Sequence, residues 1–203
     1  MSRSKNQVKS LTMMALFIAI EIVLLVTPFG YLRVGPLSAT LMHIPVIVIA
    51  SVMGVREGAF LGLVFGITSV INATMVPTVT SFAFSPFVTI GNVSGGFASL
   101  IVAIVPRVLL GVIAGCLNQY LLKKNVNRSL SAGVVAGVAT ICHTIMVLGL
   151  IYLFFAAPYS QAIGIQESAL LAFFGSVLIT NSLLEIVLAI IINIALSKVL
   201  VRS

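Results

Sequence analysis

The chain has 203 residues, of which 60% are hydrophobic and only 7% are charged, and it contains no Asp. This composition lies far outside the range of soluble globular proteins and predicts an all-α integral membrane protein. A transmembrane helix needs about 20 apolar residues, so there is room for six transmembrane helices in a single membrane domain covering residues 1–203. The net charge of +7 comes from Lys and Arg in short loops and tails. Because no aromatic residues are interleaved with them, no nucleic-acid partner is expected.

Taken in chain order, the apolar stretches predict helices at about 11–29, 37–53, 58–75, 97–122, 130–157 and 168–199. Helix-breaking residues separate these stretches. Gly35 and Pro36 lie between the first two, Pro77 follows the third, and Pro158 follows the fifth. Since proline and glycine interrupt helices, their positions support the predicted boundaries.

The basic residues predict how the spans are oriented. With six spans, nine of them lie on one side: Arg3, Lys5, Lys9, Arg56, Lys123, Lys124, Arg128, Lys198 and Arg202. Arg33 lies on the other side, where it is expected to be a solvated loop charge. The positive-inside rule therefore places both termini in the cytoplasm. No small-residue cleavage site follows the first span, so we expect that span to be retained.

The connection at residues 76–96 is long and uncharged, with Phe82, Phe84 and Phe87 among Ser, Thr and Asn residues. Long connections in compact domains are often lids or binding loops, and this aromatic content is not typical of disorder. The segment is interpreted either as a lid or wall of a binding site, or as a plain connector.

Glycines recur four residues apart in three predicted helices: Gly58, Gly62 and Gly66; Gly111 and Gly115; Gly133 and Gly137. Such stripes let helix backbones approach closely, so they are expected to pack the bundle. Cys116 and Cys142 lie inside apolar spans, where Cys usually behaves as a small buried hydrophobe. Neither a disulfide nor a metal site is expected.

The first helix carries one acidic residue, Glu21, and two alanines one turn apart, Ala15 and Ala19. At 100 degrees per residue, Glu21 points roughly 140 degrees away from the alanines. An intramembrane carboxylate is expected to face the interior. The alanines then form a flat outward patch on which a helix of another protein can dock.

A resemblance arises from these features together with HIPVIVIASVMGVREGAFLGLVFGITSVINAT, which runs from His43 to Thr74. About 200 residues, six spans and the Ala-x-x-x-Ala patch resemble the substrate-binding S component of an energy-coupling factor (ECF) vitamin transporter. The layout covers the whole chain, and the motifs lie in the first three helices. TLMHIPV in the second helix and FAFSPF in the third loop are most similar to the pantothenate type.

The resemblance implies a function that composition does not show. An S component binds a vitamin from outside the plasma membrane of a prokaryote and associates with a transmembrane coupling subunit and two ATPase subunits. Ala15 and Ala19 would then contact the coupling subunit. The chain has no Gly-x-x-x-x-Gly-Lys-Ser/Thr phosphate loop, so ATP hydrolysis is expected in the partners and no cofactor in this chain.

Arg107 lies near the middle of the fourth predicted helix, directly after Pro106. An uncompensated Arg at this depth costs about 2.5 to 3.5 kcal/mol on insertion scales, so it needs a partner. One interpretation is a structural ion pair with Glu21 or Glu185. The other is that its guanidinium binds a substrate carboxylate through two parallel hydrogen bonds. Pro106 can free a backbone carbonyl to line a cavity.

Other polar residues inside the spans are candidates for binding a substrate: Asn181, Glu185, His143 and, at the outer end of the third predicted helix, Asn72 and Thr74. Asn181 and Glu185 are one turn apart and can serve amide and hydroxyl groups. His143 is alternatively a core histidine bonded to Thr140 or Thr144, and Asn72 alternatively caps its helix. His43 is expected to reach water.

Other substrates and other classes of function are alternatives to a pantothenate-binding S component. Pantothenate, with one carboxylate, one amide, two hydroxyls and a gem-dimethyl group, fits a site with one cation, while biotin and folate are also carboxylates. A small proton-coupled secondary carrier would use Glu21, Glu185 and His143 as a relay. An enzyme is not expected, because two His and no Asp provide no convincing catalytic or metal cluster.

Overall fold

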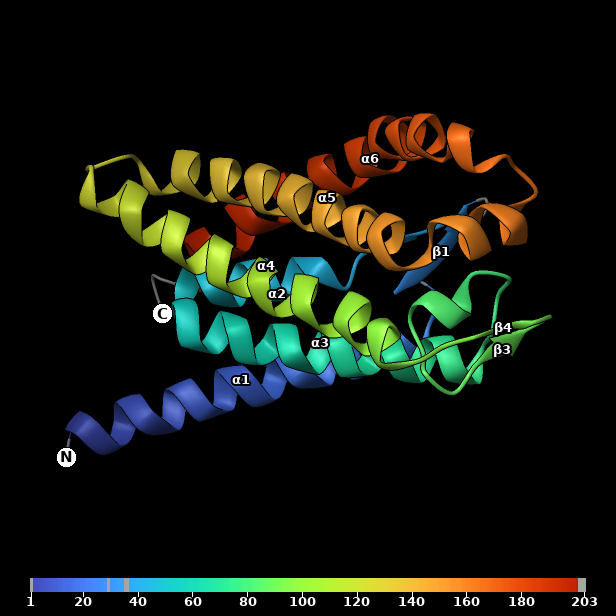
Figure 1. Cartoon of the computed structure of the whole chain (residues 1–203). Helices are drawn as coiled ribbons and strands as arrows, with labels where there is room; N and C mark the ends of the chain where they lie inside the picture. Colours follow the sequence, from blue (N-terminus) through green and yellow to red (C-terminus); the bar gives the residue numbers. More distant parts are fainter. Residues whose placement is uncertain (1, 29, 35–36, 201–203) are drawn as a thin grey trace.

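The computed structural model describes residues 2–28, 30–34 and 37–200. Five long helices surround the short helix α2, His43–Val52, and run roughly along one direction (Figure 1). They are α1 (Ser2–Val26), α3 (Val55–Met75), α4 (Phe97–Lys123), α5 (Arg128–Ile163) and α6 (Leu170–Leu200). The start of α1, the turn from α4 to α5 and the last turns of α6 lie at one end of the bundle, which we call the terminal end (Figure 1).

The opposite end, here called the hairpin end, carries the short elements (Figure 1). Two antiparallel hairpins form there, β1 (Tyr31–Val34) with β2 (Leu37–Thr40), and β3 (Thr89–Ile90) with β4 (Val93–Ser94). Two 3₁₀ helices, η1 (Ser81–Ala83) and η2 (Glu167–Ala169), complete it. This end therefore holds most of the chain that is neither transmembrane helix nor tight turn.

Close packing of α3 against α4 depends on glycine. A Cβ added at Gly62 would overlap the carbonyl oxygen of Arg107, and one added at Gly111 would overlap that of Gly58. The glycines thus let the two backbones touch, as the sequence predicts for these helices. The stripe in α5 differs, because Cβ atoms at Gly133 and Gly137 would meet only the ends of Ile side chains on α6.

Helix α2 differs from its prediction as a full span over 37–53. Residues 37–40 pair with β1 as a strand, and the helix has only ten residues. Every residue from His43 to Ala50 is buried, so α2 presents an apolar surface on all sides to other helices. A continuous apolar run of this kind does not distinguish a buried strand from a buried helix, which explains the error.

Helix α1 begins at Ser2, nine residues before the predicted start. Its large side chains Leu16, Ile20 and Val23 are exposed, whereas Phe17 and Glu21 are buried. Ala15 and Ala19 are exposed as well. The orientation predicted from the helical angle is therefore the one observed.

Helix α5 bends at Phe155, where φ is −136° and ψ is 19°. Three residues later Pro158 lacks the N–H that would bond one turn back, which is a common cause of such a kink. The helix then continues to Ile163 and ends at Gly164 in the left-handed conformation, with φ of 75°. The bend lets Phe155 and Tyr159 pack on Phe82 and Phe174, and these rings belong to a core near the hairpin end.

Two apolar cores result. The terminal core surrounds α2 and includes Phe65, Leu110 and Ala139, while the hairpin core includes Val102 and Val147.

At the terminal end a buried polar network ties four helices together. Asn118 Nδ2 donates to the Ser51 carbonyl (2.7 Å) and Ser131 Oγ to Asn118 Oδ1 (2.9 Å), while Asn193 Nδ2 donates to the Ala132 carbonyl (2.9 Å).

Five of the described helical segments are long and apolar enough to cross a membrane, and the all-α membrane class is confirmed. The predicted bounds of α3 and α4 agree with the structure to within three residues. Phe29, Gly35, Pro36 and Arg202, which the sequence predictions used, lie outside the described residues. Lys123, Arg128 and Lys198 belong to helix ends at the terminal end, but which side of the membrane this end faces stays a prediction.

Candidate functional site

A cavity of about 120 Å³ has part of its lining from β2 and the loop after α3, which belong to the hairpin end. This is many times the roughly 10–15 Å³ that a single buried water needs, so the space suits a small organic molecule. Its lining comes from α3, α4, α5, α6, strand β2 and the loop after α3: Thr40, Ser69, Asn72, Ala73, Val76, Thr78, Thr80, Ser81, Phe84, Arg107, His143, Thr144, Val147, Leu148, Val177, Asn181, Ser182 and Glu185.

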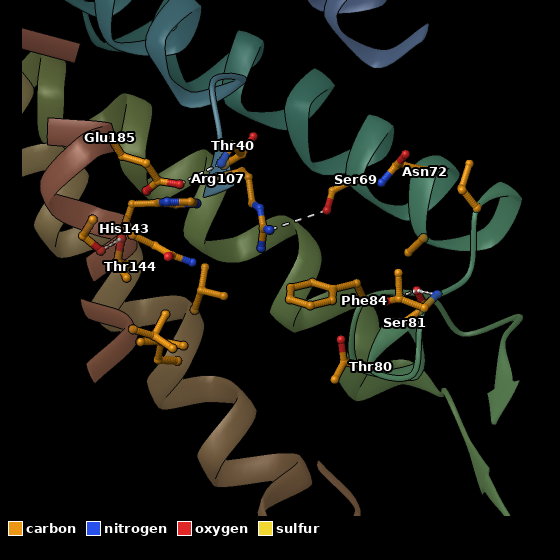
Figure 2. Close-up of a pocket in the computed structure, with 18 residues that line it drawn as sticks. Thr40, Ser69, Asn72, Thr80, Ser81, Phe84, Arg107, His143, Thr144 and Glu185 are labelled. Carbon is orange, nitrogen blue, oxygen red and sulfur yellow. Dashed lines mark hydrogen bonds between the residues drawn. The ribbon is translucent and has the colours of Figure 1, made fainter. Parts of the chain in front are cut away.

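Arg107 lies between Glu185 and His143 on one side of this cavity and Ser69 and Asn72 on the other (Figure 2). Its side chain is only 5% exposed. One terminal nitrogen, Nη1, donates to the Val102 carbonyl at 2.6 Å, and Nη2 lies 3.5 Å from Ser69 Oγ. The guanidinium carbon is 5.4 Å from the ring centres of both Phe65 and Phe84, distances typical of cation–π contacts. The cation is therefore held by a carbonyl, a hydroxyl and two aromatic faces.

Glu185 provides the carboxylate of the cavity. Its Oε1 accepts a hydrogen bond of 2.7 Å from the Thr40 backbone N–H, which ties the β1–β2 hairpin to α6 (Figure 2). Glu21 does not belong to the lining of this cavity. Both of its carboxylate oxygens are buried without a hydrogen-bond partner among the described residues, which argues against the predicted pairing of Arg107 with Glu21. Among the described lining residues, Arg107 and Glu185 carry the formal charges.

His143 lines the cavity with its ring 5.9 Å from that of Phe65. Within the part of the chain that the structure describes, its Nε2 has no hydrogen-bond partner, and neither does the Thr140 hydroxyl. The interpretation of His143 as bonded to Thr140 is therefore not supported at these atoms. His43 stacks on His143, with ring centres 6.4 Å apart and planes at 11°. His43 is fully buried, so the prediction that it reaches water is wrong.

The 76–96 connection forms one wall of the cavity, as the first of its two interpretations predicts (Figure 2). Phe84 and Ser81 come from this loop. The loop is held by side-chain hydrogen bonds: Ser81 Oγ accepts from the Thr78 N–H at 2.8 Å, and Ser99 Oγ donates to the Phe82 carbonyl at 2.6 Å. These bonds give an uncharged connection a defined shape.

Two of the predicted site residues on α3 have different positions. Asn72 lines the cavity, and its backbone carbonyl rather than its side chain accepts the Val76 N–H that ends the helix. Thr74 does not line the cavity. Its hydroxyl donates to the Val70 carbonyl and shares a 2.7 Å hydrogen bond with Ser85 Oγ. Thr74 is two positions after Asn72 and so points to another face of the helix, where it fixes the loop.

Arg107, Asn181, Glu185, His143 and Asn72 are therefore brought together from four helices. The sequence reasoning missed Thr40, Ser69, Thr144 and Ser182, although three of these had a usable signal. Ser69 is one turn before Asn72 on the same face of α3, and Thr144 and Ser182 directly follow predicted site residues. Thr40 had no such signal, because its contribution is a backbone N–H on a strand that was predicted as helix.

Comparisons with known proteins agree with this architecture. The family described as ECF transporter, substrate-specific component, matches residues 9–197. The pantothenic acid transporter PanT of Lactococcus lactis subsp. cremoris is 37% identical over 202 residues, which cover 98% of this chain and 97% of that protein. The pantothenate transporter PanT of Leuconostoc mesenteroides subsp. mesenteroides is 29% identical over 205 residues, covering 98% and 95%. The chain, a multi-pass membrane protein with a polar cavity among its helices, belongs to the family of ECF transporter substrate-specific components.

Proposed function

We propose that this protein is the high-affinity pantothenate-binding component of an ATP-driven importer. The observation that carries the proposal is the buried Arg107 in a cavity whose other described lining residues are neutral apart from Glu185. A guanidinium recognises one carboxylate, and pantothenate has one. The names of the two relatives, both pantothenate transporters, support the same vitamin.

The lining matches the rest of the vitamin in chemical type. Asn181, His143 and Glu185 offer hydrogen-bonding groups for an amide and two hydroxyls. Val147 and Leu148 offer an apolar wall for a gem-dimethyl group. In this proposal the carboxylate binds at Arg107, and the hydroxyl-bearing end lies toward Glu185, which as a carboxylate accepts hydrogen bonds and disfavours a second anion.

The hairpin end is proposed to face outward and the terminal end the cytoplasm, because the basic residues favour this orientation. The ECF family implies a transmembrane coupling subunit and two ATPase subunits as partners in this importer. The absence of a phosphate-binding loop from the sequence agrees with ATP hydrolysis in those partners. The exposed Ala15 and Ala19 on α1 are proposed as the contact with the coupling subunit. Small exposed residues on a lipid-facing helix suit close helix packing.

The test is equilibrium binding of labelled pantothenate, biotin and folate to the purified protein in detergent, beside Arg107→Ala. We expect tight binding of pantothenate alone, and its loss in the variant while circular dichroism shows an intact fold. No vitamin binding to a folded wild-type sample would contradict the proposal. Uptake that uncouplers abolish but that persists without the ATPase subunits would instead favour the secondary carrier.

A further inference from the structure

Pro106 lies inside α4, one residue before Arg107. In a regular helix the N–H of residue 106 would donate to the carbonyl of residue 102. Proline has no N–H, so the helix itself provides no donor from this position to the Val102 carbonyl. Val102 is fully buried in the hairpin core, and a buried carbonyl without a donor is costly.

Arg107 supplies the donor that Pro106 lacks. Its Nη1 donates to the Val102 carbonyl at 2.6 Å. The side chain thus turns back along its own helix toward the hairpin end, the direction that helical side chains prefer. Because the donor is cationic, this is a charge-assisted hydrogen bond, which is shorter and stronger than a neutral one. Arg107 therefore supplies the donor that Pro106 lacks, and the Val102 carbonyl that Pro106 leaves open gives the buried guanidinium an acceptor.

The hydrogen bond also orients the guanidinium within the cavity. With Nη1 fixed on Val102, the guanidinium lies near Ser69 Oγ, and its carbon is 5.4 Å from the ring centres of both Phe65 and Phe84. An arginine without this anchor has several rotatable bonds, and ordering them on binding reduces affinity. A pre-oriented guanidinium avoids that loss.

We infer that Pro106 is a positioning residue for the substrate anion: by leaving the Val102 carbonyl open, it fixes Arg107 in the orientation that meets a carboxylate. This inference rests on the proposed function, in which Arg107 binds pantothenate. It adds a residue that touches no ligand and acts through the helix backbone. A proline is unfavourable inside a helix, and residues that break a local rule are expected at functional sites.

The decisive variant is Pro106→Ala, which restores the N–H and lets residue 106 compete for the Val102 carbonyl. We expect the thermal stability in detergent to stay equal or rise, because alanine is the better helix residue. Pantothenate affinity is expected to fall by a few-fold to about tenfold, the cost of ordering one flexible side chain on binding. A proline with a purely structural role would instead lower stability when replaced and leave the affinity unchanged.

A double-mutant cycle with Arg107→Ala tests whether the effect passes through the arginine. If it does, Pro106→Ala weakens binding in the wild-type background and has no further effect on the residual affinity of Arg107→Ala. Additive losses in the two backgrounds would overturn the inference, and so would wild-type affinity in Pro106→Ala.

A second measurement needs no vitamin and so separates this inference from the proposed function. In protein labelled with ¹⁵N-arginine, the Arg107 Nη signals, assigned by their absence in Arg107→Lys, report hindered rotation of the guanidinium. We expect separate, slowly exchanging Nη signals in the wild type and averaged signals in Pro106→Ala. Identical signals in both proteins would overturn the inference, even if pantothenate failed to bind and the proposed function fell for its own reason.

Discussion

Substituting Gly62 with alanine tests the close contact between α3 and α4 that carries the site. An ideal Cβ at Gly62 would overlap the Arg107 carbonyl oxygen and lie 2.9 Å from its carbonyl carbon and 3.1 Å from Val108 Cα. Carbon atoms prefer separations of about 3.5–4.0 Å, so the helices must part by roughly 0.5–1 Å. All three contacts are backbone atoms, which have no alternative rotamer.

Overpacking of this kind costs about 1–3 kcal/mol, and we expect Gly62→Ala to lower the free energy of unfolding by that amount. Because the contact is with the backbone of Arg107 itself, the shift also moves the guanidinium relative to Phe65 and Ser69. Pantothenate affinity is therefore expected to fall as well.

Thermal unfolding in detergent, followed by far-ultraviolet circular dichroism because the chain has no Trp, measures the stability, and calorimetric titration measures the affinity. Gly149→Ala is the matched control, because a Cβ at Gly149 on α5 has nothing within 4 Å. This variant is expected to keep or slightly raise the stability and to bind normally. If Gly62→Ala unfolds and binds like Gly149→Ala, the backbone contact argued above does not exist.

Three further changes separate stability, binding and coupling. Glu185→Ala removes the acceptor of the partly buried Thr40 N–H, so it should lower the melting temperature and weaken pantothenate binding about tenfold. Glu185→Gln keeps an oxygen there and should retain the melting temperature; equal melting temperatures of the two variants would contradict this role. Asn193→Ala should cost about 0.5–1.5 kcal/mol of stability, because the hydrogen bond from Asn193 Nδ2 to the Ala132 carbonyl is lost, yet leave titrated affinity unchanged; reduced affinity in a folded sample would refute that separation. Bulky residues at Ala15 and Ala19 should abolish uptake but not binding, and lost binding would exclude the coupling face.

Much of the fold could be predicted from the sequence because membrane helices are long and apolar. The bounds of α3 and α4 followed from their apolar stretches, and Pro77 supported the end of α3. The extent of α2 could not be predicted, since a buried apolar run has the same composition whether it forms a strand or a helix. The bend at Phe155 was also missed, because Pro158 was interpreted as a terminator rather than as a kink within a continuing helix.

The candidate site was predictable where a polar side chain interrupts an apolar helix. Arg107, His143 and Glu185 stand out in this way, and each lines the cavity. Thr74, also predicted for the site, is on the same helix as Asn72, but its helical angle directs it to the loop. Thr40 contributes a backbone N–H, which no residue pattern reveals without the pairing of its strand.

The two cores explain why the cavity lies where it does. On α4, Arg107 falls between Val102 of the hairpin core and Leu110 of the terminal core. On α5, which runs the opposite way, His143 falls between Ala139 of the terminal core and Val147 of the hairpin core.

A polar layer thus separates two apolar cores. The terminal side is closed, because the network around Asn118 and Asn193 would have to lose several hydrogen bonds, each worth about 0.5–1.5 kcal/mol, before the helices could part. The hairpin side is bounded by the 76–96 loop and by the β1–β2 hairpin, which is attached through Glu185. A ligand that displaces or reorients those loops reaches Arg107 without disturbing the terminal core. Capture from the hairpin end is therefore the route that costs the bundle least.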